Sequence, residues 1–292
     1  MTEHRIDGRR VVITGATSGI GKAAALELAR RGAALTIICR NPGKGRDTVA
    51  EIERAVPGAS ADLVDADLAD LERVRRAAEE LRDRHRSIDV LIDNAGIHAT
   101  APRMANGFDH MLAVNYLGPF LLTSLLLDEL AAAAPARVIV VASEAHRLAG
   151  RLDPERFEDL SDYRLLGSFR AYGRTKLLDI LFAAELARRL AGTGVTANCL
   201  CPGTVATGLY GQLPILRTIA PALARTPLVR SAEQGARMTV RLASEPSLAN
   251  VSGRYFTSTP GLGLLPPVRA RRDADLGRRI WERTAELVGL AT

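Results

Sequence analysis

The chain of 292 residues is poor in cysteine and in aromatic residues, with three cysteines and 4% Phe, Trp and Tyr. Cys39, Cys199 and Cys201 provide neither the framework of a disulfide-stabilised secreted domain nor the paired spacing of a metal site. The five histidines add no metal-ligand spacing. We therefore expect an aliphatic core, a reducing compartment and no bound metal.

The sequence also lacks any uncharged apolar run of the roughly 20 residues that a membrane span requires. The N-terminal residues MTEHRIDGRR contain no apolar stretch of signal-peptide length. The net charge is +6, but the 39 basic residues are mixed with 33 acidic ones along the chain, which does not predict nucleic-acid binding. We expect a soluble, cytoplasmic protein with no integral membrane segment.

Short apolar runs alternate with longer amphipathic segments, a pattern typical of βαβ units. Strands are predicted at 10–14, 34–39, 60–65, 88–93, 136–142, 194–200 and 253–257. Helices are predicted at 19–31, 43–56, 69–85, 106–131, 169–191 and 231–243. The expected fold is α/β: a Rossmann-type, doubly wound parallel sheet of about seven strands with helices on both faces.

No linker-like stretch divides the chain, so a single domain over residues 1–292 is expected. Residues 204–230 interrupt the alternation with Gly, Pro and apolar residues just after a predicted strand, which suggests a cover over a site at the strand ends. An amphipathic helix is expected near 272–288.

The first predicted strand leads directly into a glycine-rich turn, and a predicted helix follows. Glycine lets the backbone approach a phosphate closely, and the free N–H groups and positive dipole end of the helix favour the anion. A glycine cluster also fits an ordinary tight turn, but its place between strand and helix favours dinucleotide binding. The expected cofactor contacts in this turn are Gly15, Thr17, Ser18, Gly19, Ile20 and Gly21.

Tyr172 and Lys176 are four residues apart in a predicted helix, so their side chains emerge on one face. A tyrosine with a pKa of about 10 is a usable acid but a poor base, and a neighbouring ammonium lowers that pKa. Ser143 ends the fifth predicted strand, where its hydroxyl fits hydrogen bonding to a developing oxyanion. Each feature alone also has a plain structural explanation, and their combination favours proton transfer at a carbonyl or alcohol.

Taken together, these motifs resemble the single-domain form of the short-chain dehydrogenase/reductase family. The resemblance extends from residue 9 to about 257 and is carried by Thr14 to Gly21, Asn94-Ala95-Gly96, Ser143, Tyr172-Gly-Arg-Thr-Lys176 and Pro202-Gly203. Within that family the chain is most similar to retinol dehydrogenase-like enzymes, through residues 39–41 (CRN), 142–146 (ASEAH) and 198–207. One departure is Thr175, where the family often has Ser; the change keeps the hydroxyl.

The resemblance implies roles for further residues. Asn115, a polar residue in an apolar predicted helix, would hold a water in the proton relay, although a hydrogen-bonded helix kink also explains it. Asp67 would contact the adenine, and a helix cap explains it equally well. The remaining cofactor contacts would be Leu68, Asn94, Ala95, Gly96, Tyr172, Lys176, Pro202, Gly203, Val205 and Thr207. A homodimer or homotetramer is also implied.

Arg40 ends the second predicted strand, 19 residues after Gly21. An acid at this place hydrogen-bonds the ribose hydroxyls of NAD, whereas the planar fork of an arginine suits the 2′-phosphate of NADP. A solvated surface arginine is the plain alternative. We therefore predict NADP(H) as the cofactor.

Apolar residues in the expected cover predict a hydrophobic carbonyl or alcohol as the substrate. Its pocket is assigned to Ser143, His146, Tyr210 and Leu213, although a lone histidine is more often a packing residue. Two other functions remain open at this point. A catalytically silent NADP(H) sensor or scaffold would keep the fold, and a nucleotide-sugar epimerase would share the Tyr and Lys but needs a larger C-terminal domain.

Overall fold

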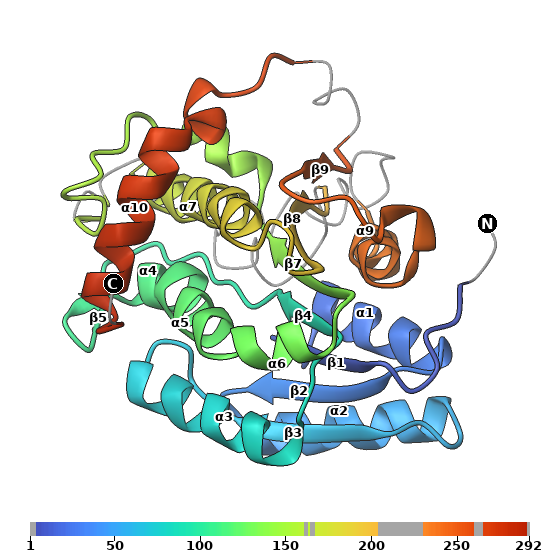
Figure 1. Cartoon of the computed structure of the whole chain (residues 1–292). Coiled ribbons are helices and arrows are strands. Elements are labelled where there is room, and N and C mark those ends of the chain that lie inside the picture. Colours follow the sequence, from blue (N-terminus) through green and yellow to red (C-terminus); the bar gives the residue numbers. More distant parts are fainter. Residues whose placement is uncertain (1–3, 161–162, 164–166, 204–229, 260–264, 291–292) are drawn as a thin grey trace.

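The computed structural model describes residues 4–160, 163, 167–203, 230–259 and 265–290. Seven parallel strands form the central sheet in the order β3-β2-β1-β4-β7-β8-β9 (Figure 1). Along the chain they are β1 (Arg10–Thr14), β2 (Ala34–Cys39), β3 (Ala61–Asp65), β4 (Val90–Asp93), β7 (Ala136–Val141), β8 (Val195–Cys201) and β9 (Tyr255–Thr257). The predicted doubly wound α/β sheet is confirmed.

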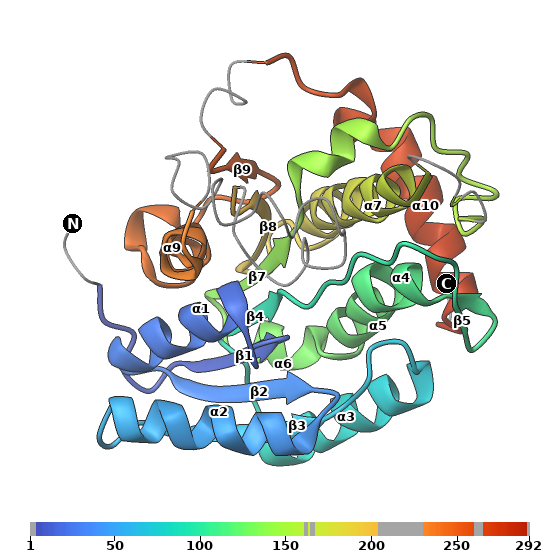
Figure 2. The ribbon, with the colours of Figure 1, turned by 180° about the vertical axis from the view of Figure 1, so that it is seen from behind.

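The central strands are mostly apolar and largely buried because helices cover both faces of the sheet. All seven residues of β8 are buried, for example. One face carries α1 (Gly19–Arg30), α2 (Pro42–Ala55) and α9 (Ala232–Ser244) (Figures 1 and 2). The other face carries α3 (Leu71–Arg84), α5 (Gly118–Leu125) and α7 (Gly167–Arg189).

The helix predicted at 106–131 begins only at His110 and is broken at Leu126. The segment begins with a hairpin of β5 (Met104–Ala105) and β6 (Phe108–Asp109), whose turn residues Asn106 and Gly107 have φ angles of 50° and 83°. Asn-Gly suits such a turn because both residues tolerate positive φ. The helical part follows as α4 (His110–Leu112), the π-helical segment η1 (Ala113–Leu117), α5, and, after a break at Leu126, α6 (Leu127–Ala132).

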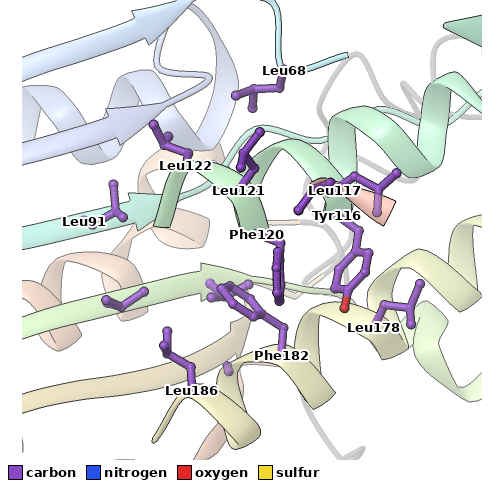
Figure 3. Close-up of a cluster of buried hydrophobic side chains, with 14 of the residues drawn as sticks. Leu68, Leu91, Tyr116, Leu117, Phe120, Leu121, Leu122, Leu178, Phe182 and Leu186 are labelled. Carbon is purple, nitrogen blue, oxygen red and sulfur yellow. The ribbon is translucent and has the colours of Figure 1, made fainter. Parts of the chain in front are cut away.

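The helix α10 (Ala274–Leu287) crosses α7 and packs against it (Figure 1). Five aromatic side chains pack together where α10 meets η1, α5 and α7. They are Tyr116, Phe120, Phe157, Phe182 and Trp281. Figure 3 shows Tyr116, Phe120 and Phe182 among the leucines of this core. The hydroxyl of Tyr116 shares a hydrogen bond of 2.8 Å with Thr284 of α10, which satisfies a polar group in an apolar cluster.

Short helical turns complete the described part of the chain. They are η2 (Glu144–Leu148), η3 (Pro246–Leu248) and η5 (Arg269–Arg272). None of the helices within the described ranges is both long and apolar enough to cross a membrane.

Candidate active site

A cavity of about 450 Å³ opens at the carboxyl ends of the central strands, where the strand order reverses between β1 and β4. This is the place where a doubly wound sheet binds its ligand. Every described residue that the sequence assigned to cofactor binding lines this cavity. They are Gly15, Thr17, Ser18, Gly19, Ile20, Gly21, Arg40, Asp67, Leu68, Asn94, Ala95, Gly96, Tyr172, Lys176, Pro202 and Gly203.

The glycine turn presents the N-terminus of α1 to the cavity. Gly15 has a φ of 68°, and a Cβ there would lie 2.7 Å from the Cα of Ala95, so glycine is required on both counts. Ser18, at the N-cap, makes no capping hydrogen bond with its side chain, and the first turn of α1 contains no acidic residue. The free N–H groups and the helix dipole therefore suit a phosphate, and the turn fits the pyrophosphate of a dinucleotide.

Hydrogen bonds hold this turn against the end of β4. The Asn94 side chain donates to the carbonyls of Thr14 at 2.9 Å and Gly15 at 3.2 Å. The hydroxyl of Thr14 accepts the backbone N–H groups of Asn94 and Ala95, both at 3.0 Å. Asn94 thus shapes the cavity wall by fixing the backbone of the turn.

Arg40 and Asp67 lie at the adenosine end of the cavity, after β2 and β3. Arg40 is exposed, and no ion pair of its guanidinium exists within the described residues. Its charge is therefore available to an anionic ligand. Asp67 accepts the backbone N–H of Ala69 at 3.0 Å, so it caps a turn as well as lining the cavity.

Tyr172 and Lys176 extend from the same side of α7 into the opposite end of the cavity. The Lys176 ammonium lies 5.9 Å from the centroid of the Tyr172 ring. Lys176 is buried, and it donates to Asp179 Oδ2 at 2.7 Å and to the carbonyl of Val141 at 3.0 Å. Burial lowers the pKa of Lys176, but the nearby Asp179 carboxylate, Tyr172 and Cys199 together raise it by more, so the ammonium is maintained.

Ser143 follows β7 and lies at the N-cap of η2. Its hydroxyl accepts the N–H of Ala145 at 3.2 Å, which uses acceptor capacity and leaves the hydroxyl proton to donate. Gly173 lets η2 pack closely on α7, since a Cβ there would lie 2.4 Å from the carbonyl oxygen of Ala145. This close approach brings Ser143 to the cavity beside Tyr172, and the role of Gly173 was not inferred from the sequence.

Asn115 lies in the π-helical segment η1, 2% exposed, and is not among the described cavity residues. Its side chain accepts the N–H of Ile97 at 2.8 Å and donates to the carbonyl of Ile97 at 2.9 Å. The amide also donates to the hydroxyl of Thr175 at 3.0 Å. The asparagine therefore links the loop after β4 to the catalytic helix, at a π-bulge of the kind often found near functional sites.

Comparison with known proteins decides the family. Residues 9–152 match the short chain dehydrogenase family. Human retinol dehydrogenase 13 is 39% identical over 296 aligned residues, which cover 98% of this chain and 86% of that protein. The chain belongs to the short-chain dehydrogenase/reductase family. It is accordingly an oxidoreductase that acts on CH–OH groups.

Solved structures are also similar to this short-chain dehydrogenase/reductase. An uncharacterized protein from Mycobacterium paratuberculosis has a TM-score of 0.76 and 32% identity, covering 98% of this chain and 96% of the other. A protein described as an NAD(P)-dependent gluconate 5-dehydrogenase from Beutenbergia cavernae, with bound NADP, has a TM-score of 0.72 and 30% identity. That alignment covers 89% of this chain and 99% of the other.

The short-chain dehydrogenase/reductase cavity contains a histidine that sequence reasoning missed. His98 is 4% exposed and lines the cavity, with its ring 5.4 Å from that of Tyr172 and 5.0 Å from that of Phe169. Its Nε2 is buried and has no hydrogen-bond partner within the described residues. Burial lowers the pKa of His98, so the ring is neutral near pH 7. Its place after Asn94-Ala95-Gly96 was the signal that could have identified it.

His146 does not line the described cavity of this short-chain dehydrogenase/reductase. Its ring is fully buried, donates a 2.8 Å hydrogen bond from Nδ1 to the carbonyl of Ser143, and packs edge-on against Tyr255. Among the described residues the ring therefore has packing contacts, and its role in facing the substrate stays a prediction. The other predicted ligand contacts, Val205, Thr207, Tyr210 and Leu213, lie outside the described residues, as does the proposed cover at 204–229.

Proposed function

We propose that this enzyme uses NADP(H) to interconvert a carbonyl and an alcohol of a hydrophobic small molecule, with Tyr172 as the general acid and base. The observation that carries the proposal is one continuous cavity that joins the glycine turn and Arg40 to Ser143, Tyr172 and Lys176. The bound nicotinamide would supply or accept the hydride.

Three residues of the chain would together bind the substrate oxygen and transfer the proton. Ser143 retains a hydroxyl proton to donate to the substrate oxygen, which stabilises negative charge as it develops there. Tyr172 gives its proton to that oxygen in reduction and removes a proton in oxidation. The Lys176 ammonium, held 5.9 Å from the Tyr172 ring centroid, favours the phenolate and so lowers the pKa of the tyrosine toward neutrality.

A flat apolar substrate suits the described wall beside Tyr172. The described wall at this end includes Ile97, His98 and Val114, and the His98 ring packs against Phe169 with ring centroids 5.0 Å apart. Human retinol dehydrogenase 13 is named after retinol, an apolar alcohol. This supports a search among retinoid-like and other hydrophobic alcohols, aldehydes and ketones. The Nε2 of His98, buried without a partner among the described residues, would bind one polar group of a substrate that displaces the side chains covering it.

Arg40→Ser is expected to weaken NADPH binding by about 10- to 150-fold, because a hydrogen bond to a charged group contributes about 1.5–3 kcal/mol. NADH binding should change little, since NADH has no 2′-phosphate. Titration of nicotinamide fluorescence measures both affinities. Arg54→Ser, in the last turn of α2, is the control, because Arg54 does not line the cavity. Equal losses of NADPH and NADH affinity would remove the assigned role of Arg40.

His98→Leu is expected to raise KM by about 3- to 10-fold for a substrate that bears a hydrogen-bonding group, through loss of one neutral hydrogen bond. KM for a matched substrate without that group should change less, and NADPH affinity should be preserved. Steady-state kinetics on such substrate pairs measure the difference. Phe169→Leu is the control, since it alters the ring packed against His98 without removing a ring nitrogen. Identical effects of the two substitutions would contradict a polar contact from His98.

The proposal as a whole is tested by titrating the protein with NADPH and NADH and then adding a panel of apolar ketones, aldehydes and alcohols. NADPH binding with substrate-dependent loss of nicotinamide absorbance is expected. NADPH binding without turnover over a broad panel would instead favour the sensor function, and failure to bind either nucleotide would overturn the proposal at its first step.

A further inference from the structure

A buried ionic cluster lies directly beneath the catalytic end of α7. Lys176 and Asp179 form an ion pair of 2.7 Å with side chains 4% and 2% exposed. The ammonium donates a second hydrogen bond to the carbonyl of Val141, at the end of β7. A lysine has three N–H donors, so one remains for a group in the cavity. A Cβ at Gly96 would lie 3.5 Å from Nζ, which places the ammonium against the loop that lines the cavity.

A second carboxyl group, Asp93, belongs to the same cluster. It ends β4 and is 3% exposed. Its Oδ2 accepts the hydroxyl of Thr123, from α5, at 2.8 Å. Its Oδ1 is buried without a hydrogen-bond partner within the described residues. A charged carboxylate with one unsatisfied oxygen is costly to bury, whereas a neutral carboxyl in this place carries a proton and avoids that cost.

Charged and titratable groups face this cluster from four elements. They are Tyr172, Lys176 and Asp179 from α7, Asp93 from β4, Cys199 from β8 and Tyr116 from η1. Burial raises the pKa of Asp93 to about 7; the hydrogen bond from Thr123 opposes this rise, and the nearby Asp179 carboxylate adds to it. Burial also raises the pKa of the Cys199 thiol well above its usual range, so Cys199 remains neutral.

We propose that Asp179 and Asp93 are positioning residues that together set the charge beneath Tyr172. Asp179 is the counter-ion of Lys176, and Asp93 is a carboxyl that stores one proton. When Asp93 is protonated, the positive charge of Lys176 and the negative charge of Asp179 cancel. Loss of that proton adds one negative charge, which disfavours the Tyr172 phenolate. The effect on Tyr172 rests on the proposed function, whereas the proton on Asp93 does not.

The proton on Asp93 is tested by unfolding the protein at several pH values with and without Asp93→Asn. The pKa of Asp93 is raised in the folded state, so the stability that it contributes is present below its unfolded pKa of about 4. This contribution is lost as the pH rises through about 7. The melting temperature of the variant should therefore rise relative to that of the wild type between pH 5 and pH 8, by at least about 2 °C.

The matched control is Asp89→Asn. Asp89 lies just before β4, pairs with Arg9 at 2.8 Å, and is remote from Lys176 at the other end of the strand. Its substitution should not reproduce the pH-dependent gap. If the difference in melting temperature between the wild type and Asp93→Asn is the same from pH 5 to pH 8, Asp93 does not hold a proton in this range and the proposal fails. This test uses no substrate, so its result is independent of the proposed function.

The effect on Tyr172 is tested by the pH dependence of alcohol oxidation. Asp179→Asn and Asp93→Asn each remove one negative charge at pH 8, so each should lower the pH of half-maximal kcat/KM by about one unit. Asp179→Glu, which restores the charge, should return the midpoint toward the wild-type value, and Asp89→Asn should leave it unchanged. Unchanged midpoints in both charge-removing variants would overturn the assigned role. If Asp179→Asn does not fold, Asp93→Asn and Asp179→Glu decide the result.

Discussion

Tyr172→Phe is expected to lower kcat/KM by about 10²–10⁴-fold while leaving NADPH binding close to that of the wild type. The substitution removes the hydroxyl assigned as the general acid and base but keeps the ring, which contacts His98. Burial of α7 and the ion pair of Lys176 with Asp179 do not depend on this hydroxyl. Steady-state kinetics with the best substrate of the panel and fluorescence titration with NADPH measure the two quantities separately.

Tyr163→Phe provides the matched control for this result. Tyr163 is also partly buried and donates a hydrogen bond of 2.8 Å to Asp109, but it does not line the cavity. Its loss should affect stability slightly and the rate hardly at all. A Tyr172→Phe enzyme with a rate near that of the wild type would refute the assignment of Tyr172 as the acid and base.

Phe120→Ala is expected to lower the free energy of unfolding by about 3–5 kcal/mol. Phe120 is fully buried in α5 and contacts the rings of Tyr116, Phe182 and Trp281, so truncation removes packing with three elements at once. The resulting cavity would lie between α5, α7 and α10, which leaves little scope for collapse. Such a loss is a large part of the 5–15 kcal/mol typical of a folded domain. Urea unfolding followed by circular dichroism measures it.

Met104→Ala is the control for this prediction. Met104 lies in the β5–β6 hairpin with 65% of its surface exposed, so its truncation should change the free energy of unfolding by less than about 0.5 kcal/mol. A loss below about 1 kcal/mol for Phe120→Ala would show that the aromatic cluster does not contribute as its burial predicts.

The parts of the site that follow local spacing could be predicted from the sequence. The glycine turn is defined by a strand, a run of small residues and a helix start, and Tyr172 and Lys176 share a side of α7 because of helical periodicity. Strands β1 and β2 match their predicted bounds because apolar runs covered on both faces have clear ends. These features depend on residues that are near one another in the chain.

The remaining features depend on contacts between distant segments. Asp93 ends β4, and Lys176 binds the carbonyl of Val141 at the end of β7. The two residues come together because β4 and β7 pair in the sheet, and the sequence gives no sign that they share an ionic cluster. The π-helical segment at Asn115 is likewise fixed by hydrogen bonds to Ile97 and Thr175, which lie 18 and 60 residues away. The break of the predicted long helix at Leu126 has no evident local cause in the residues around it.

Trp281 gives the molecule a spectroscopic probe at a single known place. It is the one tryptophan of the chain, and it stacks on Phe182 at 5.7 Å with the guanidinium of Arg189 over its ring at 4.6 Å. Its emission therefore reports on the seating of α10 against the helix that carries Tyr172 and Lys176. Coincident unfolding curves from this emission and from circular dichroism would indicate a cooperative transition. An earlier change in emission would show α10 separating from α7 before the sheet unfolds.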